Sequence, residues 1–173
     1  MITLVVGTNR PFSQSANIAK AYSKLLTNRQ VEHQILALET LPKSFIFTES
    51  FGLRSTEYAL VEAQYIEKAS AFIFIVPDYN GGFPGVLKAF IDTVDPKLWT
   101  DKKAVLVGVS SGRAGAIRGM DQLTNVLNYL KVNVFHEKPP MSKIDTLVRN
   151  GTLSEEGMKV LENQWDRAEA FLK

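Results

Sequence analysis

Residues 2–26 read ITLVVGTNRPFSQSANIAKAYSKLL, and this stretch decides the fold class. Its first five residues form an unbroken apolar run, which is typical of a parallel strand covered by helices on both faces. From residue 18 onward, apolar side chains recur at the i, i+3, i+4, i+7 and i+8 spacing of one helix face. The loop between these two patterns is rich in hydroxyls and amides and carries Arg10. The stretch therefore predicts a strand, a ligand-binding loop and a helix.

The same alternation continues along the chain. Residues 71–76 (AFIFIV) and 104–109 (AVLVGV) are also continuous apolar runs and predict central strands. Residues 31–36 (VEHQIL) and 132–135 (VNVF) mix polar with apolar side chains and predict edge strands. Helical patterns follow each run, and the last begins after Ser154, a favourable N-cap. We expect five strands alternating with five helices.

This alternation predicts an α/β fold made of one domain that spans residues 1–173. Central first, third and fourth strands with edge second and fifth strands give a five-stranded parallel sheet of order 2-1-3-4-5. Right-handed crossovers then place helices on both faces, which makes a three-layer, doubly wound arrangement. Ligands of such sheets bind beyond the carboxyl ends of the strands, where the strand order reverses. The loops after strands one, three and four are therefore the candidate site.

Composition limits the chemistry that the chain can perform. The 173 residues are 45% hydrophobic and 22% charged, as in ordinary globular proteins. They include no cysteine, which excludes disulfides, thiolate catalysis and thiolate metal sites. Redox chemistry would therefore need a bound cofactor.

Charge and hydropathy indicate neither nucleic acid nor a membrane as a partner. The formal net charge is +2, and the basic residues are scattered among acidic ones. The opening MITLVVGTN lacks the basic region of a signal peptide, and no stretch reaches the roughly 18 apolar residues of a spanning helix. We expect a cytoplasmic protein.

The first loop, GTNRPFSQSAN (residues 7–17), has the composition of a phosphate site. It lacks G-x-G-x-x-G and G-K-[ST], so it is neither a dinucleotide-binding turn nor a nucleoside-triphosphate loop. Its hydroxyls, amides and arginine precede a helix whose first N–H groups are free, which suits a compact phosphate monoester. The alternative is that Ser13 or Ser15 only caps the helix and that Arg10 is solvated.

The second loop begins PDYNGG at Pro77 and follows the most apolar strand. Asn80, Gly81 and Gly82 can take positive φ and lie close to a flat ligand, although a plain turn into a helix is the alternative. The third loop, SSGRAGAIRG (residues 110–119), again joins small residues and arginines to a helix start.

Two of these loops resemble the motifs of a known family. GTNRPFS (residues 7–13) is similar to G-S-x-R-x-x-S, and PDYNGGFPGVLK (residues 77–88) is similar to P-E-Y-N-x-S-x-P-G-x-L-K. Both motifs belong to the NAD(P)H-dependent FMN reductases, which have a flavodoxin-like fold. The chain departs from the family at Asp78, where Glu is usual, and at Ser15, where Asn is frequent.

The resemblance implies which residues hold FMN. The first loop would bind the phosphate, the second would contact the isoalloxazine through backbone N–H groups, and the third would line its pyrimidine side. The implied cofactor-binding residues are Thr8, Arg10, Ser13, Gln14, Ser15, Pro77, Asp78, Tyr79, Asn80, Gly81, Gly82, Ser110, Ser111, Gly112 and Arg113. Either Arg113 or Arg118 would meet the pyrophosphate of the nicotinamide nucleotide, or both are solvated.

The implied activity is hydride transfer from NADPH or NADH through bound FMN to a small oxidant, which is a quinone, an azo compound, a metal oxyanion or free flavin. The chemistry would belong to the cofactor, with no side chain acting as acid or base. The resemblance also implies a homodimer or homotetramer with the flavin near the subunit interface. Two alternatives are a flavodoxin-like electron carrier, which the positive net charge disfavours, and a flavin-binding scaffold.

Other features have open interpretations. Residues 41–53 (LPKSFIFTESFGL) carry Phe45, Phe47 and Phe51, which would cover the flavin, meet a second subunit or anchor the loop to its own core. His33 and His136 are isolated in the sequence, which favours structural roles.

Overall fold

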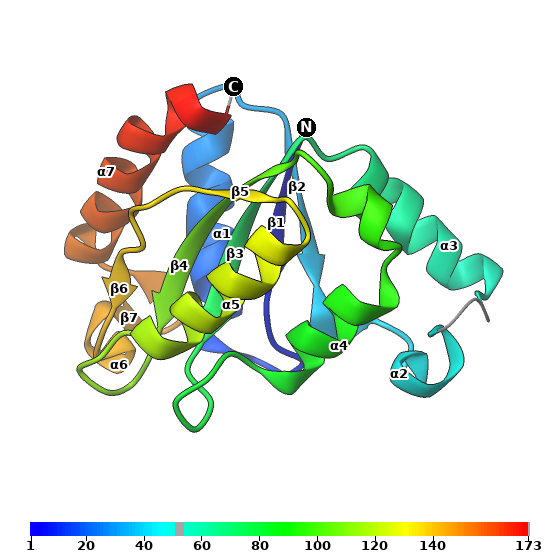
Figure 1. Cartoon of the computed structure of the whole chain (residues 1–173). Helices are drawn as coiled ribbons and strands as arrows, with labels where there is room; N and C mark the ends of the chain where they lie inside the picture. Colours follow the sequence, from blue (N-terminus) through cyan, green and yellow to red (C-terminus); the bar gives the residue numbers. More distant parts are fainter. Residues whose placement is uncertain (51–53, 173) are drawn as a thin grey trace.

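A parallel sheet forms the middle layer of the protein in the computed structural model, which describes residues 1–50 and 54–172 (Figure 1). Its strands run in the order β2-β1-β3-β4-β5, which confirms the predicted flavodoxin-like topology. They are β1 (Ile2–Val6), β2 (His33–Ala37), β3 (Ala71–Pro77), β4 (Lys103–Val109) and β5 (Asn133–Val134). β1, β3 and β4 are buried almost throughout, as expected for central strands.

Helices cover both faces of this sheet. Helices α1 (Gln14–Asn28) and α7 (Glu155–Leu172) pack on one face, and α3 (Thr56–Glu62), α4 (Gly85–Thr93) and α5 (Ile117–Tyr129) pack on the other (Figure 1). Alternate residues of each central strand enter the two cores, because successive side chains of a strand point to opposite faces. The three predicted layers are present.

Several short elements were not predicted. They are two 3₁₀ turns, a π-helical extension of α3, two short helices, a strand that pairs with β4 and a hairpin. In chain order these are η1 (Leu38–Thr40), α2 (Phe45–Thr48), η2 (Ala63–Glu67), η3 (Pro96–Trp99), β6 (Pro140–Met141), α6 (Ile144–Leu147), β7 (Val148–Arg149) and β8 (Thr152–Leu153).

The sheet contains β6 in addition to the five predicted strands, which corrects the predicted strand count. β5 pairs only with the first two residues of β4, so the rest of this edge is open to a second strand. β6 pairs there in parallel, with Gly108 opposite Pro140 and Val109 opposite Met141. Pro140 is tolerated because an edge strand can lack one N–H donor.

Element boundaries differ slightly from the sequence predictions. β2 begins at His33 rather than at residue 31, and β5 is confined to Asn133–Val134. The predicted cap of α7 is confirmed, since Ser154 Oγ accepts a hydrogen bond from Gly157 N over 3.2 Å. None of the helices in the described ranges is both long and apolar enough to cross a membrane.

Candidate functional site

A cavity of about 390 Å³ lies at the carboxyl ends of β1, β3 and β4, which are neighbours in the sheet. Its volume falls in the range of small-molecule pockets. The loops after the three strands and the start of α6 form its walls. The lining residues are Arg10, Phe12, Ser13, Gln14, Ser15, Pro77, Asp78, Tyr79, Val109, Ser110, Ser111, Ile144 and Asp145. The three loops singled out in the sequence therefore converge on one cavity.

Most of the residues implied by the family resemblance line this cavity. Those outside its lining are Thr8, Asn80, Gly81, Gly82, Gly112 and Arg113. Four lining residues were not predicted, namely Phe12, Val109, Ile144 and Asp145. Phe12 lies inside the first loop and Val109 ends a predicted strand, so position alone could have suggested both. Ile144 and Asp145 lie on a four-residue helix without a sequence signal.

The start of α1 supplies hydrogen-bond donors to the cavity. Ser13 Oγ accepts a hydrogen bond from Ala16 N over 3.2 Å, so the predicted capping alternative holds for Ser13. The N–H groups of Gln14 and Ser15 lack partners within the helix, and none of the backbone hydrogen bonds in the described residues involves them. Arg10 is exposed and forms no ion pair with the rest of the described chain. Free donors and a cation at a helix start favour an anion.

Ser15 carries the observation that most favours a ligand. The residue is 1% exposed, and its Oγ has no hydrogen-bond partner in the part of the chain that the structure describes. Buried hydroxyls are almost always paired, because an unpaired one costs about 1–3 kcal/mol. Since Ser15 lines the cavity, a ligand oxygen placed there would satisfy this hydroxyl.

The second loop forms a tight two-residue turn. Tyr79 and Gly82 exchange backbone hydrogen bonds, with N–O distances of 2.9 and 3.2 Å. Asn80 and Gly81 have φ values of 57° and 81°, which is the pattern of a type I′ turn. Asp78 Oδ1 accepts a further hydrogen bond from Gly81 N over 2.9 Å. The positive φ expected from the sequence is present at Asn80 and Gly81 but not at Gly82.

The third loop is held by its own serine. Ser110 Oγ donates to Gly112 O and accepts from Gly115 N, each over 3.0 Å. The backbone oxygen of Ser110 also accepts a hydrogen bond from Ile144 N over 3.0 Å. This contact brings α6, with Asp145, to the cavity wall. Ser110 therefore has a structural role in the loop and also lines the cavity.

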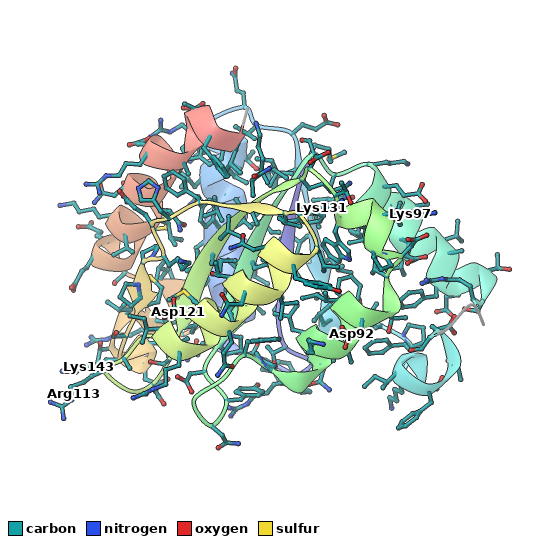
Figure 2. The ribbon with its side chains drawn as sticks, in the orientation of Figure 1. Asp92, Lys97, Arg113, Asp121, Lys131 and Lys143 are labelled. Carbon is teal, nitrogen blue, oxygen red and sulfur yellow. The ribbon has the colours of Figure 1, made fainter. Side chains whose placement is uncertain are left out.

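The arginines of the third loop lie outside the cavity lining. Figure 2 shows the Arg113 side chain extending outward beside Lys143. Arg118 is also exposed, at the start of α5. Neither forms an ion pair within the described residues.

The two histidines lie apart from this cavity. Both ring nitrogens of His33 are engaged, Nε2 with Ser23 Oγ at 2.7 Å and Nδ1 with Val31 O at 2.8 Å. His136 is exposed and lies 4.0 Å from a Glu137 carboxylate oxygen. Across residues 1–50 and 54–172, no group of three or more His, Cys, Asp or Glu side chains is arranged to hold a metal ion.

Residues 41–43, 45 and 46 line part of a second cavity of about 600 Å³, which Asn9 and Pro11 of the first loop also line. Leu41 and Phe45 are buried in the core, so this part of the segment anchors to its own subunit. Phe47 is 87% exposed. The predictions for Phe51 and for residues 52–53 lie outside the described residues.

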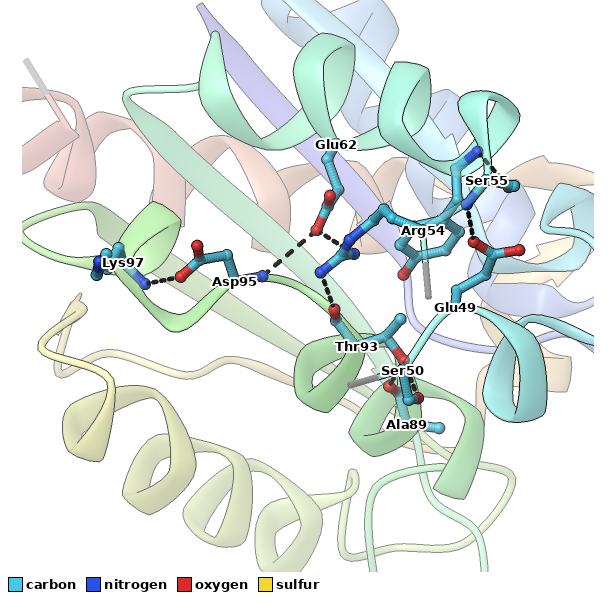
Figure 3. Close-up of polar contacts among 10 residues, drawn as sticks. Glu49, Ser50, Arg54, Ser55, Glu62, Ala89, Thr93, Asp95 and Lys97 are labelled. Atoms are coloured by element: carbon cyan, nitrogen blue, oxygen red, sulfur yellow. Dashed lines mark hydrogen bonds and ion pairs between the residues drawn. The ribbon is translucent and has the colours of Figure 1, made fainter. Parts of the chain in front are cut away.

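A polar cluster ties this segment to α3 and α4 (Figure 3). Arg54 Nη1 lies 2.6 Å from Glu62 Oε1, and Arg54 Nη2 donates to Thr93 O over 2.7 Å. Burial raises the pKa of Glu62 above its ordinary value, although Arg54 opposes the shift. Glu49 Oε2 accepts from Ser55 N over 2.7 Å, and this hydrogen bond holds the pKa of Glu49 below its ordinary value.

Solved structures share this architecture over nearly the whole chain. FerB, a flavoenzyme NAD(P)H:(acceptor) oxidoreductase from Paracoccus denitrificans, superposes with a TM-score of 0.76, at 24% identity, over 99% of this chain and 94% of that chain. A flavodoxin from the domain Archaea superposes with a TM-score of 0.63, at 12% identity, over 98% of both chains. The fold is therefore the flavodoxin-like fold.

Sequence comparison identifies the family. The model of the NADPH-dependent FMN reductases matches residues 1–145, and the chain belongs to this family. A 2-hydroxy-1,4-benzoquinone reductase from Burkholderia sp is 29% identical over 166 residues, which cover 84% of this chain and 88% of that protein. An NAD(P)H:quinone oxidoreductase from Solanum tuberosum is 29% identical over 113 residues, which cover 63% and 58%. The protein is thus an FMN-dependent oxidoreductase that takes electrons from NAD(P)H and passes them to an acceptor substrate.

Proposed function

We propose that FMN binds in the 390 Å³ cavity, with its phosphate at the start of α1 and its ring between the second and third loops. The unpartnered hydroxyl of Ser15 is the observation that carries this placement. It points to an oxygen-rich group beside the free N–H donors of α1 and the Arg10 guanidinium. A dianionic phosphate fits this set of donors better than a neutral group does.

The fifteen residues implied by the family resemblance remain our proposed contacts, and the geometry suggests how some of them act. Ser13 caps α1 and Ser110 holds the third loop, so both hydroxyls already have partners. Ser13 and Ser110 would therefore reach the cofactor through backbone atoms. The Ser15 hydroxyl and the Gln14 N–H group, which have no partner among the described residues, would instead donate hydrogen bonds to it.

When bound, FMN supplies the two-electron chemistry that accepts hydride from NAD(P)H and delivers it to the acceptor. The chain binds and orients the cofactor. Arg10 and the α1 N–H groups balance the phosphate charge, while Tyr79 and the backbone of the second and third loops form the walls beside the ring. We propose that no side chain of this chain acts as an acid or base.

We further propose a quinone as the acceptor, since the relatives from Burkholderia sp and Solanum tuberosum are named as a benzoquinone reductase and a quinone oxidoreductase. Azo compounds, metal oxyanions and free flavin are the remaining candidates. A cytoplasmic location and a single FMN-binding domain over residues 1–173 also remain predictions from the sequence.

We propose a homodimer or homotetramer with the flavin near the subunit interface. Large apolar side chains exposed on the chain support such contacts, namely Phe12, Phe47 and Tyr129, which are 100%, 87% and 88% exposed. Light scattering of the purified protein tests the oligomeric state.

The decisive experiment measures the visible spectrum of the purified protein after addition of FMN, and then its bleaching by NADPH or NADH without air. Binding, followed by bleaching and by recolouring with a quinone, is the expected result. A protein that leaves FMN free in solution would contradict the proposed site. Accumulation of the one-electron form during stepwise reduction would favour the electron carrier, and bound flavin that neither nucleotide bleaches would favour the scaffold.

A further inference from the structure

Thr8 lies between the first and second loops. It is 1% exposed and follows β1 by two residues. Its Oγ1 accepts a hydrogen bond from Arg10 N over 3.1 Å and lies 2.7 Å from the phenol oxygen of Tyr79. Among the hydrogen bonds described for residues 8–12, the contact with Tyr79 is the one that reaches another loop. One hydroxyl therefore connects two walls of the cavity.

Tyr79 is held at both ends. Its backbone belongs to the type I′ turn, through reciprocal hydrogen bonds with Gly82. Its phenol hydroxyl forms a hydrogen bond with the Thr8 hydroxyl, and its side chain lines the cavity. With the turn fixed at one end and the hydroxyl at the other, the direction of the ring across the cavity is set by Thr8.

Arg10 depends on the same oxygen. Its backbone N–H bonds to Thr8 Oγ1, and the chain then reaches Phe12, which has a φ of 54°. Positive φ is unfavourable for a bulky side chain, so this loop conformation needs external support. The Thr8 hydroxyl fixes this loop at Arg10, two residues before Phe12.

We propose that Thr8 is a positioning residue, whose hydroxyl sets Arg10 and the Tyr79 ring at the separation that FMN requires. This inference rests on the proposed function of the cavity as the FMN site. It adds to the direct phosphate contact that the family resemblance implies for Thr8, because it makes Thr8 and Tyr79 act as one unit. Loss of either hydroxyl should then affect FMN through the same contact.

A double-mutant cycle tests this coupling. Thr8→Val keeps the side-chain shape and removes the hydroxyl, and Tyr79→Phe removes only the phenol oxygen. A hydrogen bond of this kind is worth about 0.5–1.5 kcal/mol, so we expect Tyr79→Phe to raise the dissociation constant of FMN by about two- to tenfold. Thr8→Val should have a larger effect, since it also removes the acceptor of Arg10 N–H. The double variant should match Thr8→Val within about twofold.

Two further variants separate positioning from folding. Thr8→Ser restores the hydroxyl and should return FMN binding to within about twofold of the unaltered protein. Thr3→Val is the matched control, because Thr3 is a buried β1 threonine whose hydroxyl donates to Tyr65 O over 2.8 Å, outside the cavity lining. Thr3→Val should lower the melting temperature without changing FMN affinity.

The outcomes distinguish the inference from the proposed function. Losses that multiply in the double variant would overturn the coupling, as would a Thr8→Ser variant no better than Thr8→Val, provided that the unaltered protein binds FMN. Failure of the unaltered protein to bind FMN would overturn both proposals. If Thr8→Val does not fold, Tyr79→Phe and Thr8→Ser still test the inference. Unchanged FMN affinity in Tyr79→Phe would refute the role of the contact between Thr8 and Tyr79.

Discussion

Gln14 and Asp145 are 131 positions apart in the sequence and meet at the cavity, where Gln14 Nε2 donates to Asp145 Oδ1 over 3.3 Å. The contact joins the start of α1 to α6. It also places a carboxylate on the wall of a cavity that we assign to a phosphate. Like charges repel, so Asp145 should weaken FMN binding and keep the cofactor exchangeable.

Asp145→Asn should therefore tighten FMN binding, by a few-fold because the carboxylate is exposed and screened. Riboflavin, which lacks the phosphate, should bind as before. Fluorescence titration with both ligands at low and high salt measures the effect, which should shrink as salt rises. Asp121→Asn, at an exposed position of α5 outside the cavity lining, is the matched control. Unchanged or weaker FMN binding in Asp145→Asn would contradict the proposed repulsion, because the Asn side-chain oxygen can still accept the hydrogen bond from Gln14.

Arg10→Ala tests the placement of the phosphate by removing a positive charge, where Asp145→Asn removes a negative one. Charge-assisted contacts are worth about 1.5–3 kcal/mol, so FMN binding should weaken by about 10- to 100-fold while riboflavin binding changes little. The change is measured by the same titrations. Lys97→Ala removes a positive charge from η3, far from Arg113 and Lys143 in Figure 2, and should leave both affinities unchanged. Equal losses of FMN and riboflavin would mean that Arg10 contacts another part of the cofactor.

The sequence was sufficient to predict the strand order and the three loops of the site, for physical reasons. Continuous apolar runs identify strands buried on both faces, and the order of central and edge strands follows from which runs are continuous. The carboxyl ends of β1, β3 and β4 then meet by topology. The loops that follow them can therefore be assigned to one site from the sequence alone.

Contacts between distant short segments could not be predicted. β6 and α6 contain two and four residues, which is too short for a periodic pattern to identify. Asp145 reaches the cavity because backbone hydrogen bonds dock residues 141–144 onto the third loop. The link from Thr8 to Tyr79 was also invisible, because a hydroxyl in a polar loop suits a ligand and a neighbouring side chain equally well.

Ser15→Ala should separate ligand binding from stability. The hydroxyl has no partner among the described residues, so its removal should leave the melting temperature of the cofactor-free protein unchanged or slightly higher. FMN affinity should fall by about tenfold, as expected for a lost hydrogen bond to a charged group. Ser13→Ala is the opposite case, because its Oγ caps α1. That variant should lose about 1 kcal/mol of stability. A Ser15→Ala protein that is destabilised yet binds FMN normally would refute the assigned role.

Glu49→Gln should change how stability depends on pH. The Ser55 N–H hydrogen bond, aided by Thr48 and by the Arg54 charge, holds the pKa of Glu49 below its ordinary value of 4.5. A carboxylate with a lowered folded-state pKa stabilises the folded state above its unfolded pKa and loses that contribution as pH falls through the folded value. The unaltered protein should therefore have the higher urea midpoint at pH 7, and its advantage over Glu49→Gln should narrow below about pH 4.5. Urea unfolding of both proteins from pH 7 to pH 3 measures the difference between their midpoints. Glu62, whose raised pKa has the opposite effect on stability, is present in both proteins, so its contribution cancels in this difference. A difference that stays constant with pH would show that the charge of Glu49 adds nothing to its hydrogen bond with Ser55 N.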